Sequence, residues 1–108
     1  MKPSLPFNRV MGLNVVDEAL YQQYRQQMVP ILTEYGGAFT YDFRVAEVLF
    51  AQSDAPVNRV FCIRFPSHTC MSAFFADRRY VDIREQYFIH AVSAVTPIAI
   101  GQDLSVEA

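Results

Sequence analysis

The stretch RVFCIRFPS, residues 59–67, decides how this sequence is expected to fold. Its first seven residues are nearly all apolar, which is typical of a strand in the centre of a sheet. Pro66 cannot donate to a strand ladder, and Ser67 carries a side-chain oxygen that can cap a helix. The stretch therefore predicts a central strand over residues 59–65 that leads directly into a helix.

The residues before this stretch predict a strand over residues 7–16, followed by a helix. Asp17 is the expected N-cap of the helix, and residues 36–37, both glycine, are expected to end it. Pro30 lacks a backbone donor, so it should kink the helix or divide it near Met28. The helix has one apolar stripe with spacings of three and four, formed by Leu20, Tyr24, Met28, Ile31, Leu32 and Tyr35.

A long strand, either regular or bulged, is expected over residues 38–50. Phe39, Tyr41 and Phe43 alternate with polar residues, so the pattern places these three aromatic side chains on one side of the strand. The polar residues 52–58 then predict the connection of a hairpin into the central strand.

The last third of the chain predicts a second helix and a final strand. Asp77 is the expected cap of a further helical turn. The strand is predicted over residues 91–100, where Pro97 indicates an edge strand or an interruption. The inward residues of the helical part are expected to be Cys70, Met71, Phe74, Phe75, Tyr80, Ile83 and Tyr87.

The predicted order of elements is βαββαβ, and its commonest solution is an α+β fold of the ferredoxin-like kind. In that sandwich an antiparallel sheet carries its helices on one face. We expect one such domain over residues 1–108. The other face of the sheet has no cover, so two chains are expected to pair face to face as a homodimer, in a dimeric α+β barrel.

Composition limits the classes of partner. Hydrophobic residues make up 52% of the sequence and charged residues 19%, which indicates a globular protein. A net charge of −2 with scattered basic residues argues against nucleic-acid binding. Cys62 and Cys70 are expected to be free thiols. The first ten residues lack the apolar segment of a signal peptide, and no apolar run is long enough to span a membrane, so a cytoplasmic protein is expected.

Several short motifs together resemble a known family. They are YQQYR at 21–25, YGG at 35–37, AEVL at 46–49, the RVFCIRFPS stretch, and Tyr80 three residues after a capping aspartate. In this order and spacing they are similar to the bacterial family called domain of unknown function 1330. The resemblance spans about residues 15–101. It implies the dimeric α+β barrel fold and supplies no activity.

The sequence departs from the family pattern at two positions. Arg64 stands where the family usually carries an acid, and Tyr87 stands where a basic residue is common, with Arg84 nearby as a substitute. A change in the sign of a pocket charge changes which charged group the pocket accepts. A ligand that serves relatives can therefore differ here.

Five residues are candidates for ligand binding: Tyr24, Arg25, Tyr41, Glu47 and Arg64. Arg25 and Tyr24 share the helix face that borders the sheet, where a guanidinium can bind a carboxylate or phosphate or form an internal ion pair. Glu47 and Arg64 are expected to face each other across a hairpin, an arrangement that is most often structural. Tyr41 can line a pocket for a flat organic ligand, or lie in the core or a dimer interface.

Catalytic candidates are His90 and Arg64. Histidine suits the role of general base, although a histidine among apolar neighbours is more often simply packed. His68 is expected to be exposed in the first turn of the second helix. The two histidines have no carboxylate at ligand spacing, so neither a metal site nor a cofactor is expected.

The first functional hypothesis is a homodimer that binds a small, partly apolar or anionic metabolite between sheet and helices. The alternative is a cofactor-free enzyme like the monooxygenases and isomerases of the dimeric barrel superfamily, and it rests on analogy of fold. A third possibility is an interaction module. The sequence leaves open whether the protein is an enzyme.

Overall fold

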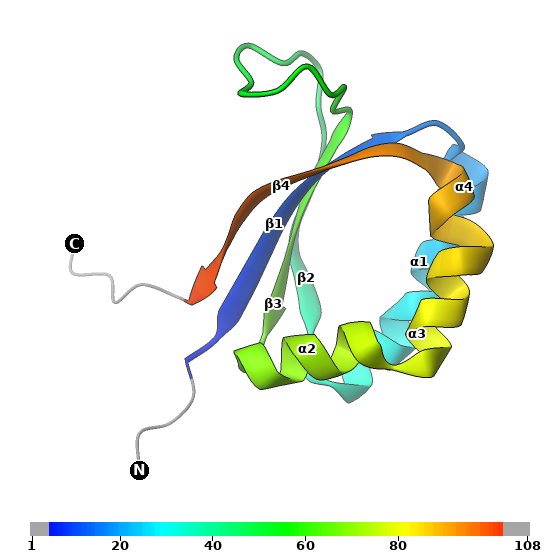
Figure 1. The fold of residues 1–108 in the computed structure, drawn as a ribbon, viewed down its shortest axis with the longest axis vertical. Coiled ribbons are helices and arrows are strands. Elements are labelled where there is room, and N and C mark those ends of the chain that lie inside the picture. Colours follow the sequence, from blue (N-terminus) through cyan, green and yellow to red (C-terminus); the bar gives the residue numbers. More distant parts are fainter. Residues whose placement is uncertain (1–4, 103–108) are drawn as a thin grey trace.

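The structure, a computed structural model, describes residues 5–102 and contains a four-stranded antiparallel sheet in the order β2-β3-β1-β4. All of the helices lie on one side of this sheet (Figure 1). The predicted ferredoxin-like α+β fold is confirmed; residues 1–4 and 103–108 of the predicted domain lie outside the described residues. The elements are β1 (Phe7–Val15), α1 (Glu18–Glu34), β2 (Ala38–Arg44), β3 (Arg59–Phe65), α2 (His68–Ala76), α3 (Arg78–Ile83), η1 (Arg84–Phe88), α4 (Ile89–Ala91) and β4 (Val92–Gln102).

Three helices begin at the side-chain caps that the sequence predicts. Asp17 accepts a hydrogen bond from the backbone N–H of Leu20 at 3.0 Å, and Ser67 accepts one from Cys70 at 3.1 Å. Asp77 caps α3 in the same way. These bonds satisfy backbone donors that have no partner inside the helix, which fixes where each helix starts.

The first helix ends as predicted but is not divided. Gly36 adopts a φ of 75°, the left-handed conformation that favours glycine after a helix. The expected division at Pro30 is wrong, because α1 continues through this residue to Glu34. Pro30 lies on the exposed side, while Met28 and Ile31 on either side of it are buried in the core. Packing of the buried face therefore holds the two halves of the helix together.

The second strand is shorter than predicted and its aromatic residues do not share one side. β2 ends at Arg44, and the register with β3 shifts between Phe39 and Tyr41. Because of this shift Phe39 packs against the core, whereas Tyr41 and Phe43 face away from the helices. The predicted single aromatic stripe is therefore wrong.

The residues between β2 and β3 form a long loop over positions 45–58, drawn in green beyond the end of the sheet in Figure 1. Asn58 closes its base. The Asn58 amide donates to the Val15 carbonyl at 2.8 Å and accepts from the Val15 N–H at 2.8 Å. The Val45 N–H donates to the Asn58 carbonyl at 2.9 Å. The side chain of Asn58 thus extends the β1–β3 ladder beyond the start of β3.

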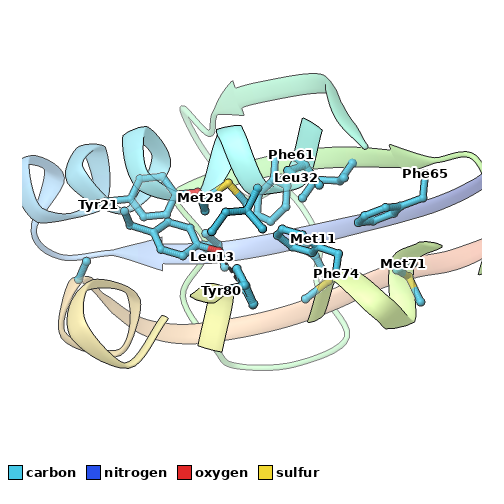
Figure 2. Packing of buried hydrophobic residues seen from close by; sticks show 14 of the residues in the cluster. Met11, Leu13, Tyr21, Met28, Leu32, Phe61, Phe65, Met71, Phe74 and Tyr80 are labelled. Carbon is cyan, nitrogen blue, oxygen red and sulfur yellow. Dashed lines mark hydrogen bonds between the residues drawn. The ribbon is translucent and has the colours of Figure 1, made fainter. Parts of the chain in front are cut away.

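The core lies between the sheet and the helices, where Figure 2 shows side chains from β1, β3, α1, α2 and α3 meeting. Phe74 is fully buried, and its ring centroid lies 4.4 Å from that of Tyr80 and 5.9 Å from that of Phe65. Such buried aromatic pairs add about 0.5–1.5 kcal/mol each beyond the area they bury. This cluster fixes α2 and α3 on the sheet.

The last part of the chain contains a π-helical turn and an edge strand. The turn, η1, follows α3 directly and leads into α4. An extra residue in a helical turn rotates the side chains around it, and such turns often lie at functional sites. β4 pairs only with β1, and Pro97 stands next to an irregularity of the ladder, as an edge position allows.

Candidate functional site

An open pocket of about 550 Å³ lies on the helix side of the sheet. It is bounded by β1, α2, α3 and η1, and its volume is in the range of ligand sites. Its lining includes Arg9, Met71, Phe75, Tyr80, Val81 and Arg84. The lining is mostly apolar, and its charged groups are two arginines from distant parts of the chain.

The two arginines come to this pocket from different elements, β1 and η1. Arg9 lies on β1, in the row of side chains that points toward the helices, and its guanidinium lies 4.7 Å from the centroid of the Phe75 ring. Arg84 comes from η1 and lies 5.9 Å from the Phe88 ring. Within residues 5–102 neither guanidinium has a carboxylate oxygen within 4.0 Å. The pocket therefore carries positive charge that the described part of the chain does not neutralise.

A pair of hydrogen-bonded tyrosines borders the pocket through Tyr80, which is one of its lining residues. The oxygens of Tyr24 and Tyr80 are 2.9 Å apart, and both residues are buried. Burial raises the pKa of Tyr24 well above its usual value, and the neighbouring Tyr80 raises it further. Burial also raises the pKa of Tyr80, but the hydrogen bond with Tyr24 and the charges of Arg84 and Arg9 oppose that increase. The Tyr80 hydroxyl thus lies within the field of both arginines.

Arg25, the anion-binding candidate of the sequence, forms an internal ion pair instead. Its Nη2 lies 3.2 Å from an oxygen of Asp42, although this contact is not aligned as a hydrogen bond. Its Nε donates to the hydroxyl of Tyr21 at 2.9 Å, and its guanidinium lies 3.7 Å from the centroid of the Phe39 ring. Of the two roles considered for Arg25, anion binding and an internal ion pair, the structure shows the internal ion pair.

Asp42 also accepts two hydrogen bonds from Arg59, each at 2.9 Å. This fork-like pairing with Arg59 holds the pKa of the Asp42 carboxyl below its usual value, with Arg25 adding to the effect. Glu18 is a second carboxylate near Arg59, at 3.5 Å. The cluster joins α1 to the β2–β3 hairpin.

The predicted cross-strand pair of Glu47 and Arg64 is wrong. Glu47 lies in the loop after β2, whereas the partners of Arg64 in the ladders are Ala38 and Asn8. The pairing fails because β2 ends three residues before Glu47. Arg64 lies on the sheet face that points away from the helices.

That outer face is the second hollowed surface of the described residues, with a volume of about 600 Å³. Tyr41 and Phe43 stack there with their ring centroids 5.8 Å apart, and they remain 63% and 55% exposed. Val10, Val60 and Cys62 complete its apolar floor. None of the helices that the structure describes within residues 5–102 covers this side of the sheet (Figure 1). It is an uncovered apolar surface with Arg64 at one part of its lining.

Neither histidine lines the pocket between sheet and helices. His90 is exposed in the short helix α4, and His68 is exposed with its ring 4.9 Å from the Phe7 ring. Residues 5–102 contain no group of three histidine, cysteine, aspartate or glutamate side chains placed to hold a metal ion. Within the same range no helix has the length and apolar character needed to cross a membrane.

Sequence reasoning missed Arg9 and underused Arg84. The signal for Arg9 was present, because it shares the inward side of β1 with Met11 and Leu13, where a charge is unusual. A cation in an otherwise buried row indicates a pocket or a buried partner. For Arg84 the sequence offered no such signal, since a π-helical turn sets its direction.

These features define the class of protein: a small ferredoxin-like α+β domain with a positively charged pocket between sheet and helices. A family model matches residues 9–96, so the chain belongs to the family described as domain of unknown function (DUF1330). The resemblance inferred from the sequence is thereby confirmed. No curated protein matches the chain.

Solved structures share the fold at low sequence identity. A protein of unknown function from Rhodopseudomonas palustris, RPA0582, is 16% identical with a TM-score of 0.78, covering 95% of this chain and 85% of its own. At3g17210 of Arabidopsis thaliana is 13% identical with a TM-score of 0.69, covering 94% and 99%. SnoaB, a cofactor-independent oxygenase from Streptomyces nogalater, is 9% identical with a TM-score of 0.58, covering 98% of each chain. At these identities the likeness shows a shared fold.

Proposed function

We propose that this protein is a homodimer that binds a small, partly apolar organic anion in the pocket between sheet and helices. The observation that carries the proposal is the pair Arg9 and Arg84, two guanidinium groups that share one apolar pocket without a carboxylate among the described residues. Arg9 is half-buried beside apolar side chains, and a cation with less water around it attracts an anion more strongly than one in bulk water. A carboxylate with an apolar tail matches both the charge and the lining.

The size and lining of the pocket favour a metabolite over a macromolecule. A hollow of about 550 Å³ holds a molecule of small metabolite size. Met71 and Phe75 offer apolar contacts to its tail, and Tyr80 offers one neutral donor. Of the ligand-binding residues expected from sequence, Tyr24 contributes through its bond to Tyr80.

The proposal is tested with aryl and alkyl monocarboxylates, such as phenylacetate and hexanoate, against their neutral amides. Isothermal titration should detect the acids and not the amides. Arg9→Gln or Arg84→Gln should weaken binding about 10- to 100-fold, since a hydrogen bond to a charged group contributes about 1.5–3 kcal/mol. Arg78→Gln is the matched control, because Arg78 is an exposed cation on α3 whose partner is Asp82. Equal binding of acids and amides would refute the anion site.

The dimer part of the proposal is supported by the outer sheet face. Tyr41, Phe43 and Ile98 are each more than half exposed on an apolar surface, and burial of such a surface favours association. Light scattering at micromolar concentration should give twice the mass of one chain. Phe43→Asp should yield monomers, whereas Val29→Asp, at an exposed apolar position of α1, should not. A monomeric wild-type protein would contradict the proposal.

The second candidate function is a cofactor-free enzyme of the monooxygenase or isomerase kind. The observation that favours it is the Tyr24–Tyr80 hydroxyl pair, which borders the pocket through Tyr80 and can donate to a developing oxyanion. Oxygen uptake or a spectral change with activated aromatic or dienone compounds would be lost in Tyr80→Phe. If the activity were lost in His90→Ala and kept in Tyr80→Phe, the catalytic group would be His90, which is exposed on α4.

A further inference from the structure

The two hydrogen-bonded tyrosines have different surroundings, although both residues are about 5% exposed or less. Tyr24 extends from α1, and its ring packs 5.0 Å from Phe88 and 5.7 Å from Tyr21, measured between centroids. Tyr80 extends from α3, and its ring is packed against aromatic rings as well, 4.4 Å from Phe74 and 5.4 Å from Phe75 between centroids. The difference between the two residues is that Tyr80 borders the pocket and Tyr24 does not.

Each hydroxyl has one hydrogen to donate, and the bond between them uses only one of the two. Within residues 5–102 neither hydroxyl has a further hydrogen-bond partner. If Tyr80 donated to Tyr24, the hydrogen of Tyr24 would be buried among rings with no acceptor. A buried donor without a partner costs about 1–3 kcal/mol. If Tyr24 donates to Tyr80, the remaining hydrogen belongs to Tyr80 and can reach the pocket.

From this asymmetry we infer a directed chain of donors, in which Tyr24 donates to Tyr80 and Tyr80 donates to an oxygen of the bound ligand. The inference rests on the proposed function and deepens it. Arg9 and Arg84 supply the charge, and Tyr80 supplies a neutral donor. The ligand class is therefore an anion with its negative charge on oxygen, a carboxylate or an enolate, bound with that oxygen toward Tyr80.

The charges around Tyr80 suit a donor to the ligand. Arg84 and Arg9 both favour negative charge on the Tyr80 oxygen, which strengthens the hydrogen bond that its hydroxyl can donate to an anion. At Tyr24, burial and the neighbouring Tyr80 raise the pKa more than the charge of Arg25 lowers it. A hydroxyl that accepts one hydrogen bond donates a stronger one, since bonds in a chain polarise each other. Tyr24 is accordingly a positioning residue that acts through Tyr80.

The direction is tested without any ligand by NMR of protein labelled at the tyrosine ζ-carbon. Tyr24→Phe should raise the pKa of Tyr80, because Tyr80 loses the donor that stabilises its ionised form. Tyr87→Phe, which removes an outward hydroxyl bonded to Gln86, should leave the Tyr80 titration unchanged. A Tyr80 pKa that falls or stays the same in Tyr24→Phe would overturn the directed chain.

The donor to the ligand is tested by calorimetry with phenylacetate. Tyr80→Phe should weaken binding about ten-fold or more, Tyr24→Phe by a smaller factor, and Tyr87→Phe not at all. If Arg9→Gln and Arg84→Gln weaken binding while Tyr80→Phe does not, the donor chain fails and the anion site stands. If no monocarboxylate binds the wild-type protein, the proposed ligand class fails, and the NMR titration still decides the direction of the hydroxyl pair.

Discussion

Replacing Asn58 by alanine should destabilise the protein by about 3 kcal/mol. The substitution removes both hydrogen bonds between the Asn58 amide and the backbone of Val15, each 2.8 Å long. Two such bonds contribute about 1 kcal/mol each. Val15 is only 6% exposed, so its freed N–H and carbonyl are poorly hydrated, which adds about 1 kcal/mol or more. For a domain of this size the loss corresponds to a fall in melting temperature of roughly 10–20 °C.

The assay is urea and thermal unfolding followed by circular dichroism, at one fixed protein concentration. Asn14→Ala is the matched control, because it removes one asparagine bond, an exposed contact of 2.8 Å to Ser93 on the neighbouring strand. Exposed substitutions of this kind change the free energy of unfolding by about 0.5 kcal/mol or less. Equal stability of the two variants would refute the view that Asn58 functions as part of the ladder.

Three further changes test the fold. Gly36→Ala should destabilise by about 1–2 kcal/mol in urea unfolding, because φ is 75° and the new Cβ would lie 2.6 Å from Pro66, whereas Gly101→Ala meets nothing within 4 Å and should not. Phe74→Ala should cost about 3–5 kcal/mol in the same assay, as expected for a fully buried ring. The pKa of Asp42 is lower in the folded protein than its usual value of 3.8, so its ionised form stabilises the fold above pH 3.8 and this contribution is lost as the pH falls below that value. In acid unfolding, Asp42→Asn should therefore lose less stability below pH 3.8 than the wild-type protein does.

Much of the fold was predictable because its signals are local. Asp17, Ser67 and Asp77 act within three residues of themselves, and Gly36 sets its own backbone conformation. The register shift after Phe39 was not predictable from alternation, since it depends on how β2 meets β3. Caps and turns can therefore be read from neighbours in sequence, while strand ends and faces require the partner strand.

The candidate site was predictable only in its location between sheet and helices. Arg25 carries a guanidinium that could bind an anion, but this group is already paired with Asp42 and packed on the Phe39 ring. Arg9 and Arg84 are 75 positions apart, and only the folded arrangement of the helices over β1 brings them to one pocket. Such a meeting of distant residues has no signature in a single sequence.

The alternation of side chains along β1 has a consequence for how this protein can diverge. Arg9 belongs to the pocket beneath the helices, while its neighbours Asn8 and Val10 belong to the opposite surface. One strand thus encodes two surfaces in interleaved positions, separated by the thickness of a single sheet. A substitution at Arg9 can change what the pocket accepts, and substitutions at Asn8 or Val10 can change the outer surface. The ligand preference of the pocket and the character of the outer surface can therefore change independently, although both depend on the same nine-residue strand.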